Sequence, residues 1–228
     1  MAAIADAGEI DELPLPAMAV EEESLFDVTA ETVDATLIFF GIDNAGKSTL
    51  LQMLKNDRMV QNQPTLHPSV EEIVIDKVRF RAFDLAGHET GRRLWSEYFG
   101  IASAIFFLVD AADRTRFPEA AEEIQKLLRA PGLAAVPLAV LGMKVDLADA
   151  SSEQEFRDAM GLSPGAAPPG RLVDVFMCSV VERRGYGDAI RWLSGHVLER
   201  RVSVASATEK SAAIGAVAAS ADDADEFV

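Results

Sequence analysis

The sequence predicts an α/β protein with a doubly wound, mostly parallel sheet of six strands and flanking helices. Apolar runs of strand length alternate along the chain with segments of helical character. The first run, from Thr36 to Phe40, leads into a glycine-containing loop and then into a helix-like segment. Polar motifs directly follow several other runs. Since such a sheet binds its ligand at the carboxyl ends of its strands, these motifs are expected to meet there.

The individual elements are predicted from hydrophobic pattern. Segments 35–40 and 104–109 are apolar throughout, as expected of parallel strands covered on both faces. Segments 70–75 and 78–83 alternate polar and apolar residues, which predicts a hairpin. Two further strands are predicted at 136–142 and 172–178, and helices at 49–54, 118–128 and 187–198.

Charge and composition divide the chain into three parts. Residues 1–34 hold ten acidic residues and no Lys or Arg, which predicts a largely disordered acidic tail. Residues 35–202 hold 22 acidic and 20 basic residues and are expected to form one domain. Residues 203–228 are rich in Ala and Ser, with five acidic residues and one Lys. They are predicted to form a flexible tail.

The same features exclude several classes of protein. The net charge of -16 arises mainly from the two tails, so the nearly neutral domain offers no basic patch for nucleic acid. A single cysteine, Cys178, allows no internal disulfide and fits a reducing compartment. No run approaches 18 uncharged apolar residues, and the N-terminus lacks the pattern of a signal peptide. A cytoplasmic protein is therefore expected.

Residues 41–48 match the pattern G-x-x-x-x-G-K-S between the first strand and the first helix. This context indicates a phosphate-binding loop. Its glycines let the backbone approach a phosphate, and its N–H groups and the helix N-terminus supply positive charge. Lys47 would reach the β- and γ-phosphates, and Ser48 would hold Mg²⁺. The alternative is a strand-to-helix turn that merely contains glycines, and the match in this context favours the phosphate-binding loop over it.

A second loop, 63–68, contains two prolines and lies between the first helix and the strand at 70–75. Prolines exclude a helix interior, so this loop can fold over a bound nucleotide. Thr65 is a candidate for completing the Mg²⁺ shell when a γ-phosphate is present. A threonine in a loop can equally be structural, and the pattern leaves both interpretations open.

A third loop begins where the strand at 78–83 leads into Asp84. An aspartate there is placed to hold Mg²⁺ through water, and Gly87 would let a backbone N–H approach the γ-phosphate. His88 follows, where its side chain could orient an attacking water. A lone histidine is usually a structural residue, but the spacing from Asp84 and Gly87 favours the functional interpretation.

These loops, followed by Lys144-Val145-Asp146 and a Cys178-Ser179 turn, resemble in their order those of a Ras-superfamily small GTPase. The residues at 43–48, 84–89 and 92–95 resemble the Arf/Sar group in particular. Three further segments look like the Sar branch, which starts the COPII coat at the endoplasmic reticulum: 64–68, 175–180 and 184–187. The resemblance covers about residues 36–198.

The resemblance implies a P-loop small GTPase fold, Mg²⁺ as cofactor and GTP or GDP as ligand. Lys47 and the backbone of 41–48 would hold the phosphates, and Gly87 would sense the γ-phosphate. His88 would position water where Ras proteins use Gln. The implied catalytic residues are Gly87 and His88, and the implied metal ligands are Ser48, Thr65 and Asp84, the last through water.

At the base, Lys144 would lie along the ring and Asp146 would accept hydrogen bonds from guanine N1 and N2. Arg92 and Arg93 are candidates for switch contacts, because family members usually receive their catalytic Arg from a partner. The residues implied to contact nucleotide are Asp43, Asn44, Ala45, Gly46, Lys47, Ser48, Thr49, Lys144, Asp146, Ser179 and Val180.

Three features depart from the family pattern. Met143 stands where the family has an Asn that bonds the base and braces the phosphate loop, and Met can offer packing and only a weak sulfur acceptor. Ala86 replaces a second Gly before Gly87. Residues 1–34 lack the aromatic face and cations of a membrane-inserting helix, and Met1-Ala2 excludes N-myristoylation.

The leading hypothesis is a GTP-hydrolysing switch of the Sar type, slow without an activating partner. The alternatives are a GTPase-like binding module with weak or no turnover, and a kinase on the same fold. The implied partners are GTPase-activating proteins, exchange proteins and coat subunits. The resemblance also implies recruitment to the endoplasmic reticulum or Golgi surface, whereas the sequence leaves membrane contact by the N-terminus open.

Overall fold

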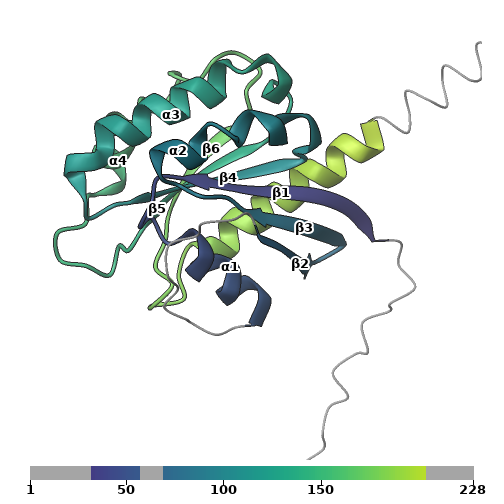
Figure 1. The fold of residues 1–228 in the computed structure, drawn as a ribbon, viewed down its shortest axis with the longest axis horizontal. Helices are drawn as coiled ribbons and strands as arrows, with labels where there is room; N and C mark the ends of the chain where they lie inside the picture. Colours follow the sequence, from purple (N-terminus) through teal and green to yellow (C-terminus); the bar gives the residue numbers. More distant parts are fainter. Residues whose placement is uncertain (1–31, 57–68, 204–228) are drawn as a thin grey trace, which may run out of the picture. The chain divides into compact units, whose positions relative to one another are not determined.

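A computed structural model describes residues 32–56 and 69–203, which form a six-stranded sheet with helices on both faces (Figure 1). The strand order is β2-β3-β1-β4-β5-β6, in which β2 is antiparallel to β3 and all other neighbours are parallel. This confirms the predicted fold class and the predicted hairpin. The strands are β1 Val33–Gly41, β2 Ser69–Ile75, β3 Val78–Asp84, β4 Ala104–Asp110, β5 Leu138–Met143 and β6 Val173–Met177.

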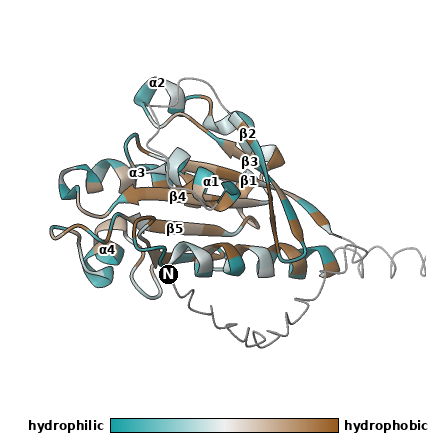
Figure 2. Ribbon diagram, turned by 90° about the horizontal axis from the view of Figure 1, so that it is seen from below, coloured by the Kyte–Doolittle hydropathy of each residue, from teal (hydrophilic) through white to brown (hydrophobic). Residues whose placement is uncertain are grey.

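The central strand β1 is buried on both faces because alternate side chains enter two separate cores. Leu37 and Phe39 belong to one core, and Ile38 and Phe40 belong to the other. All four side chains are fully buried. Successive residues of a strand point to opposite faces, so a continuous apolar run is what a covered parallel strand requires. Strands β4 and β5 are likewise hydrophobic along their length (Figure 2).

Helices complete the two cores. Helix α1 and a C-terminal helix over 186–203 contribute buried residues to the core of Leu37. Helices α3 and α4 contribute to the core of Ile38. The labelled helices are α1 Lys47–Asn56, α2 Glu89–Arg92, α3 Phe117–Arg129 and α4 Glu153–Met160, and short 3-10 helices lie at Trp95–Ile101, Arg114–Arg116 and Pro131–Leu133.

Helix α4 is an element that the sequence analysis did not predict. It has eight residues and buries only Phe156 and Met160, so a single apolar i, i+4 pair was its periodic signal. Its sequence signal was a capping box, in which Ser152 and Glu155 bond each other's backbone N–H. Strand β5 also begins at Leu138, two residues later than predicted, because Val136 N–H bonds Leu133 O in the preceding turn.

Three predictions lie outside the described residues: the acidic tail, the loop with Thr65, and the Ala- and Ser-rich tail, apart from a few residues at the inner ends of the two tails. Within the described part of the chain, no helix is both long and apolar enough to cross a membrane.

Candidate functional site

The loop between β1 and α1 wraps tightly at the carboxyl edge of the sheet. Gly41 has φ +135°, and a Cβ there would lie 2.3 Å from Leu108 O. Asn44 and Gly46 also have positive φ, at 61° and 91°. Glycine adopts such angles without steric cost, and Asn tolerates the left-handed region better than most residues. Helix α1 then begins at Lys47, so the backbone N–H groups at its start lie in the loop.

Lys47 lies inside this loop and is buried. Its Nζ donates to Gly41 O at 2.9 Å and to Ile42 O at 3.0 Å. Burial lowers the pKa of Lys47 to about 8, although the nearby charges of Asp84 and Asp43 oppose the change. A buried ammonium group solvated mainly by carbonyl dipoles gains strongly from an anionic ligand.

Ser48 and Asp84 meet beside the loop. Asp84 is buried at the end of β3, opposite Phe39 of β1, and its Oδ2 accepts a hydrogen bond from Ser48 Oγ. A hydroxyl and a carboxylate are the hard oxygen ligands that suit Mg²⁺, which usually also keeps phosphate and water oxygens. Among residues 32–56 and 69–203, no cluster of three or more His, Cys, Asp or Glu forms a protein-only metal site. The oxygen chemistry of Ser48 and Asp84 fits a Mg²⁺ ion.

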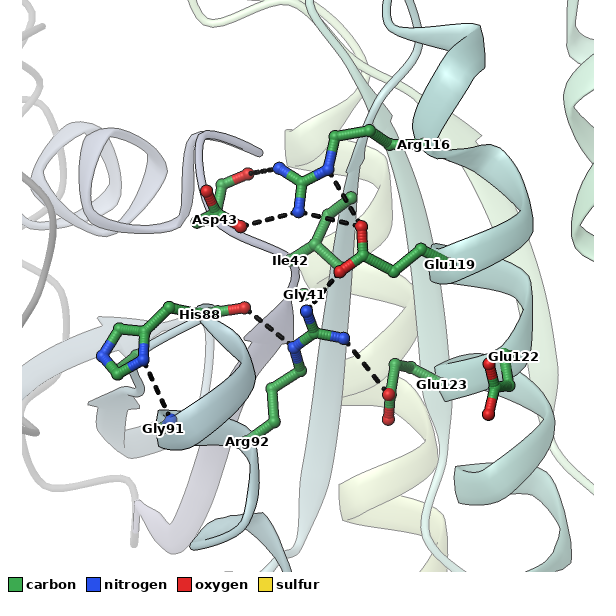
Figure 3. Close-up of polar contacts among 12 residues, drawn as sticks. Gly41, Ile42, Asp43, His88, Gly91, Arg92, Arg116, Glu119, Glu122 and Glu123 are labelled. Carbon is green, nitrogen blue, oxygen red and sulfur yellow. Dashed lines mark hydrogen bonds and ion pairs between the residues drawn. The ribbon is translucent and has the colours of Figure 1, made fainter.

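Gly87 packs directly against the phosphate loop. A Cβ at this position would lie 2.5 Å from both Asp43 N and Lys47 Nζ, so only glycine allows this approach. The next residue, His88, is exposed, and its Nδ1 accepts a hydrogen bond from Gly91 N at 3.0 Å (Figure 3). This bond caps helix α2 and leaves the ring proton on Nε2. The side chain thus faces its own helix while Nε2 stays available as a donor.

A pocket of about 190 Å³ opens beside the loop, where the sequence analysis placed the base. Most of its exposed lining is apolar. At its polar side, Asp146 Oδ1 accepts from Ser179 Oγ at 2.6 Å, and Lys144 Nζ lies 2.6 Å from Asp110 Oδ2. The lining residues are Ala45, Gly46, Thr49, Met143, Lys144, Asp146, Leu147, Val180 and Val181. Ser179, which the resemblance places at the nucleotide, is not among these lining residues. It contributes to the pocket through its hydrogen bond to Asp146.

The structure also accommodates two of the departures from the family pattern. Met143 is buried at the end of β5, and its Cε lies 3.9 Å from an ideal Cβ position on Gly46. Met143 thus lies close to the phosphate loop at Gly46. Ala86 is buried against Gly91, where an added Cβ would lie 2.6 Å from the Ala86 Cβ. The missing side chain at Gly91 makes room for the extra methyl group at Ala86.

Two arginines lie nearer to the site than the sequence analysis indicated. Arg116 donates from Nη1 to Asp43 O at 3.0 Å and from Nη2 to Asp43 Oδ1 at 2.7 Å. Its hydrogen bond holds the pKa of Asp43 below the usual value. Arg92, a predicted switch contact, donates from Nε to Gly87 O at 2.9 Å, whereas Arg93 is exposed. No motif pointed to Arg116, because its contact joins residues 73 positions apart.

Comparison with a family model and with individual proteins points to one protein family. A model of the ADP-ribosylation factor family matches residues 23–197. The small COPII coat GTPase SAR1 of Giardia intestinalis is 42% identical over 171 residues, which cover 72% of this chain and 90% of that protein. SAR1 of Nicotiana tabacum is 39% identical over 179 residues, with the same coverage. The Arl6 BBS3 small GTPase of Trypanosoma brucei, solved with the nucleotide analogue GppNp, has a TM-score of 0.66 and 24% identity. The match covers 73% of this chain and 99% of the Trypanosoma chain. At 24% identity it supports the fold alone.

Proposed function

Because the chain belongs to the ADP-ribosylation factor family, whose members hydrolyse GTP, we propose that this GTPase is a switch of the Sar type that starts assembly of a COPII coat. Two SAR1 proteins at 42% and 39% identity support this choice within the family. The observation that carries the proposed site is the meeting of Lys47, Ser48 and Asp84 beside Gly87 at one edge of the sheet.

The proposed phosphate site consists of Lys47 and the backbone of 41–48. Ser48 and Asp84 would hold Mg²⁺, with Thr65 as a further ligand that lies outside the described residues. When bound, Mg²⁺ neutralises charge on the phosphate oxygens. The Gly87 N–H would then bond the γ-phosphate, while Lys47 adds a charge that needs no reorganisation during the reaction.

In the proposed hydrolysis, His88 orients the attacking water. Its Nε2–H is free to do so while Nδ1 accepts from Gly91 N. Arg92 and Arg116 are both bound to carboxylates near the site, so neither is a ready arginine finger. We therefore infer slow turnover in isolation and acceleration by an activating protein that supplies an Arg in trans. Exchange proteins and coat subunits complete the proposed set of partners.

The proposed base site uses Asp146 as an acceptor for guanine N1 and N2, with Ser179 holding the carboxylate in place. Lys144 and Val180 line the same pocket. Met143 favours a second candidate function, a GTPase-like module that binds GTP weakly and turns it over little, because its thioether cannot replace a buried amide.

Labelled GTP separates these functions. Purified protein with Mg²⁺ is expected to bind GTP and release phosphate slowly, and to do so faster with an activating protein. Weak binding without release would favour the module. Transfer of phosphate to an acceptor other than water would favour a kinase.

We further propose recruitment to the endoplasmic reticulum surface through a protein partner. Ten acidic residues and no basic ones in residues 1–34 oppose contact with an anionic leaflet, where each Lys or Arg would contribute about 1 kcal/mol of attraction. Flotation with anionic liposomes, with GTP or GDP, compares the full chain with a variant starting at Thr32. GTP-dependent flotation that disappears on truncation would show direct anchoring by the N-terminus.

A further inference from the structure

Two arginine clamps hold the parts of the site that must stay aligned during hydrolysis. Arg116 grips the phosphate loop through the main-chain oxygen and the carboxylate of Asp43, at 3.0 and 2.7 Å. Arg92 grips the second loop through Gly87 O, at 2.9 Å. Arg116 therefore binds one partner of the contact between Gly87 and the phosphate loop, which is the loop, and Arg92 binds the other, which is Gly87.

One carboxylate joins the two clamps. Glu119, in the first turn of α3, accepts from Arg116 Nε at 3.0 Å through Oε2 and from Arg92 Nη2 through Oε1 (Figure 3). Burial alone would raise the pKa of Glu119, but the hydrogen bonds from Arg92 and Arg116 lower it, so the group stays ionised near neutral pH. Helix α3 itself is fixed on the sheet by buried residues such as Ile124.

We propose that Glu119 is a positioning residue for GTP hydrolysis, which keeps Gly87 and His88 aligned with the phosphate loop through Arg92 and Arg116. This inference rests on the nucleotide site proposed above. Gly87 lies so close to Asp43 N and Lys47 Nζ that no Cβ fits between them. A small displacement of either loop therefore changes the geometry of water, γ-phosphate and N–H, and misalignment of this kind lowers rates steeply.

Glu119 joins the two loops through Arg92 and Arg116, and it is not among the residues that line the pocket proposed for the base. Its removal should therefore slow the chemical step more than it weakens GTP binding. The side chains of Glu119 and Arg116 are 37% and 27% exposed, and partly exposed ion pairs contribute little to folding. A variant at Glu119 is thus expected to fold.

The test compares Glu119→Gln with Glu122→Gln. Glu122 lies on the same helix, is exposed and pairs with Lys126 at 2.9 Å. The control therefore makes the same charge change at a residue whose paired cation is neither Arg92 nor Arg116, although Lys126 also pairs with Glu123, which binds Arg92. In single-turnover hydrolysis of preloaded GTP, Glu119→Gln is expected to be about tenfold slower, and Glu122→Gln unchanged. The GTP Kd of Glu119→Gln should stay within about twofold of the wild type, and both variants should melt at similar temperatures.

A cycle with Arg92→Lys and Arg116→Lys tests whether the clamps act through Glu119. Each change should slow hydrolysis in the wild type and add little in Glu119→Gln, because coupled residues are not additive. Additive losses, an unchanged rate in Glu119→Gln, or an equal loss in Glu122→Gln would overturn the inference. If Glu119→Gln does not fold, Glu119→Asp replaces it, because aspartate keeps the charge but is too short to bridge both arginines. A hydrolysis rate of Glu119→Asp equal to that of the wild type would then overturn the inference.

Failure of the site itself would be distinguishable. A wild-type protein that neither binds nor hydrolyses GTP would overturn both the proposed function and this inference. A wild type that hydrolyses GTP together with a Glu119→Gln variant of equal rate would overturn only the role of Glu119.

Discussion

The two ends of the proposed nucleotide site are built differently. At the phosphate end, Lys47, the Ser48–Asp84 pair and the Asp43–Arg116 pair surround the loop with charges and hydrogen bonds. At the base end, a mostly apolar pocket presents Asp146 and Lys144 at its polar side, and its floor includes the buried Met143. Affinity should therefore depend on charge at one end and on packing and one carboxylate at the other.

The largest effect is expected from Lys47→Ala. The phosphates would lose charge-assisted hydrogen bonds from a buried cation, and two such bonds at about 2 kcal/mol each correspond to about 1,000-fold weaker GTP binding. Titration calorimetry with GTP and Mg²⁺ measures this change. Lys55→Ala, at an exposed position of the same helix that pairs with Glu71, is the control and should bind normally. Equal affinity in Lys47→Ala would disprove the phosphate site.

His88→Gly should act on turnover rather than affinity. Loss of the imidazole is expected to reduce partner-stimulated hydrolysis about 100-fold, in the range for a group that directs a reacting proton or water. The GTP Kd should hardly change. His88→Asn is the matched control for capping, because Asn can still accept from Gly91 N; its loss of activity should be as large. Stimulated turnover equal to that of the wild type would return His88 to a purely structural role.

At the base end, Met143→Asn is expected to bind GTP about 20-fold more tightly, since a buried hydrogen bond is typically worth about 1 to 3 kcal/mol. Asp146 should preserve the preference for guanine in both proteins. Met143→Leu, which keeps volume and apolar character, should match the wild type. Competition binding with GTP, GDP and ATP measures both quantities. Equal or weaker binding by Met143→Asn would show that the pocket has adapted around Met143.

The smallest effect is a pH dependence at the phosphate end. Because burial lowers the pKa of Lys47 to about 8, the free protein loses this proton above pH 8, whereas bound phosphates keep Lys47 charged. Nucleotide binding must then take up a proton, so GDP affinity should be flat below pH 7.5 and fall about tenfold between pH 7 and 9.

The free energy of unfolding changes with pH in the opposite direction to the nucleotide affinity. Between about pH 8 and the ordinary pKa of 10.5, the unfolded chain holds the lysine proton that the folded chain has lost. The free energy of unfolding of the nucleotide-free protein should therefore rise with pH across this window. Lys47→Ala serves as control in both titrations, because ionisation of the nucleotide affects it equally. The same pH profile in that variant would contradict the assignment to Lys47.

The sequence by itself determined the sheet, its hairpin and the order of the loops at its carboxyl edge. Apolar runs such as residues 37–40 encode covered strands locally, and the G-x-x-x-x-G-K-S pattern encodes the loop within eight consecutive residues. Lys47, Ser48 and Asp84 could be singled out for the same reason, since each follows a strand at a spacing set by the backbone. Thr65 remains a prediction from that spacing.

Only the tertiary structure decided which distant side chains complete the site. The pairing of Arg116 with Asp43, the bridge through Glu119 and the position of Met143 beside Gly46 all join separate segments. Such contacts depend on how α3 and the strand ends pack against the sheet, and no local periodicity records that packing. Charge pairs and close approaches between segments are therefore fixed by the fold, whereas strands, turns and phosphate loops are encoded by contiguous residues.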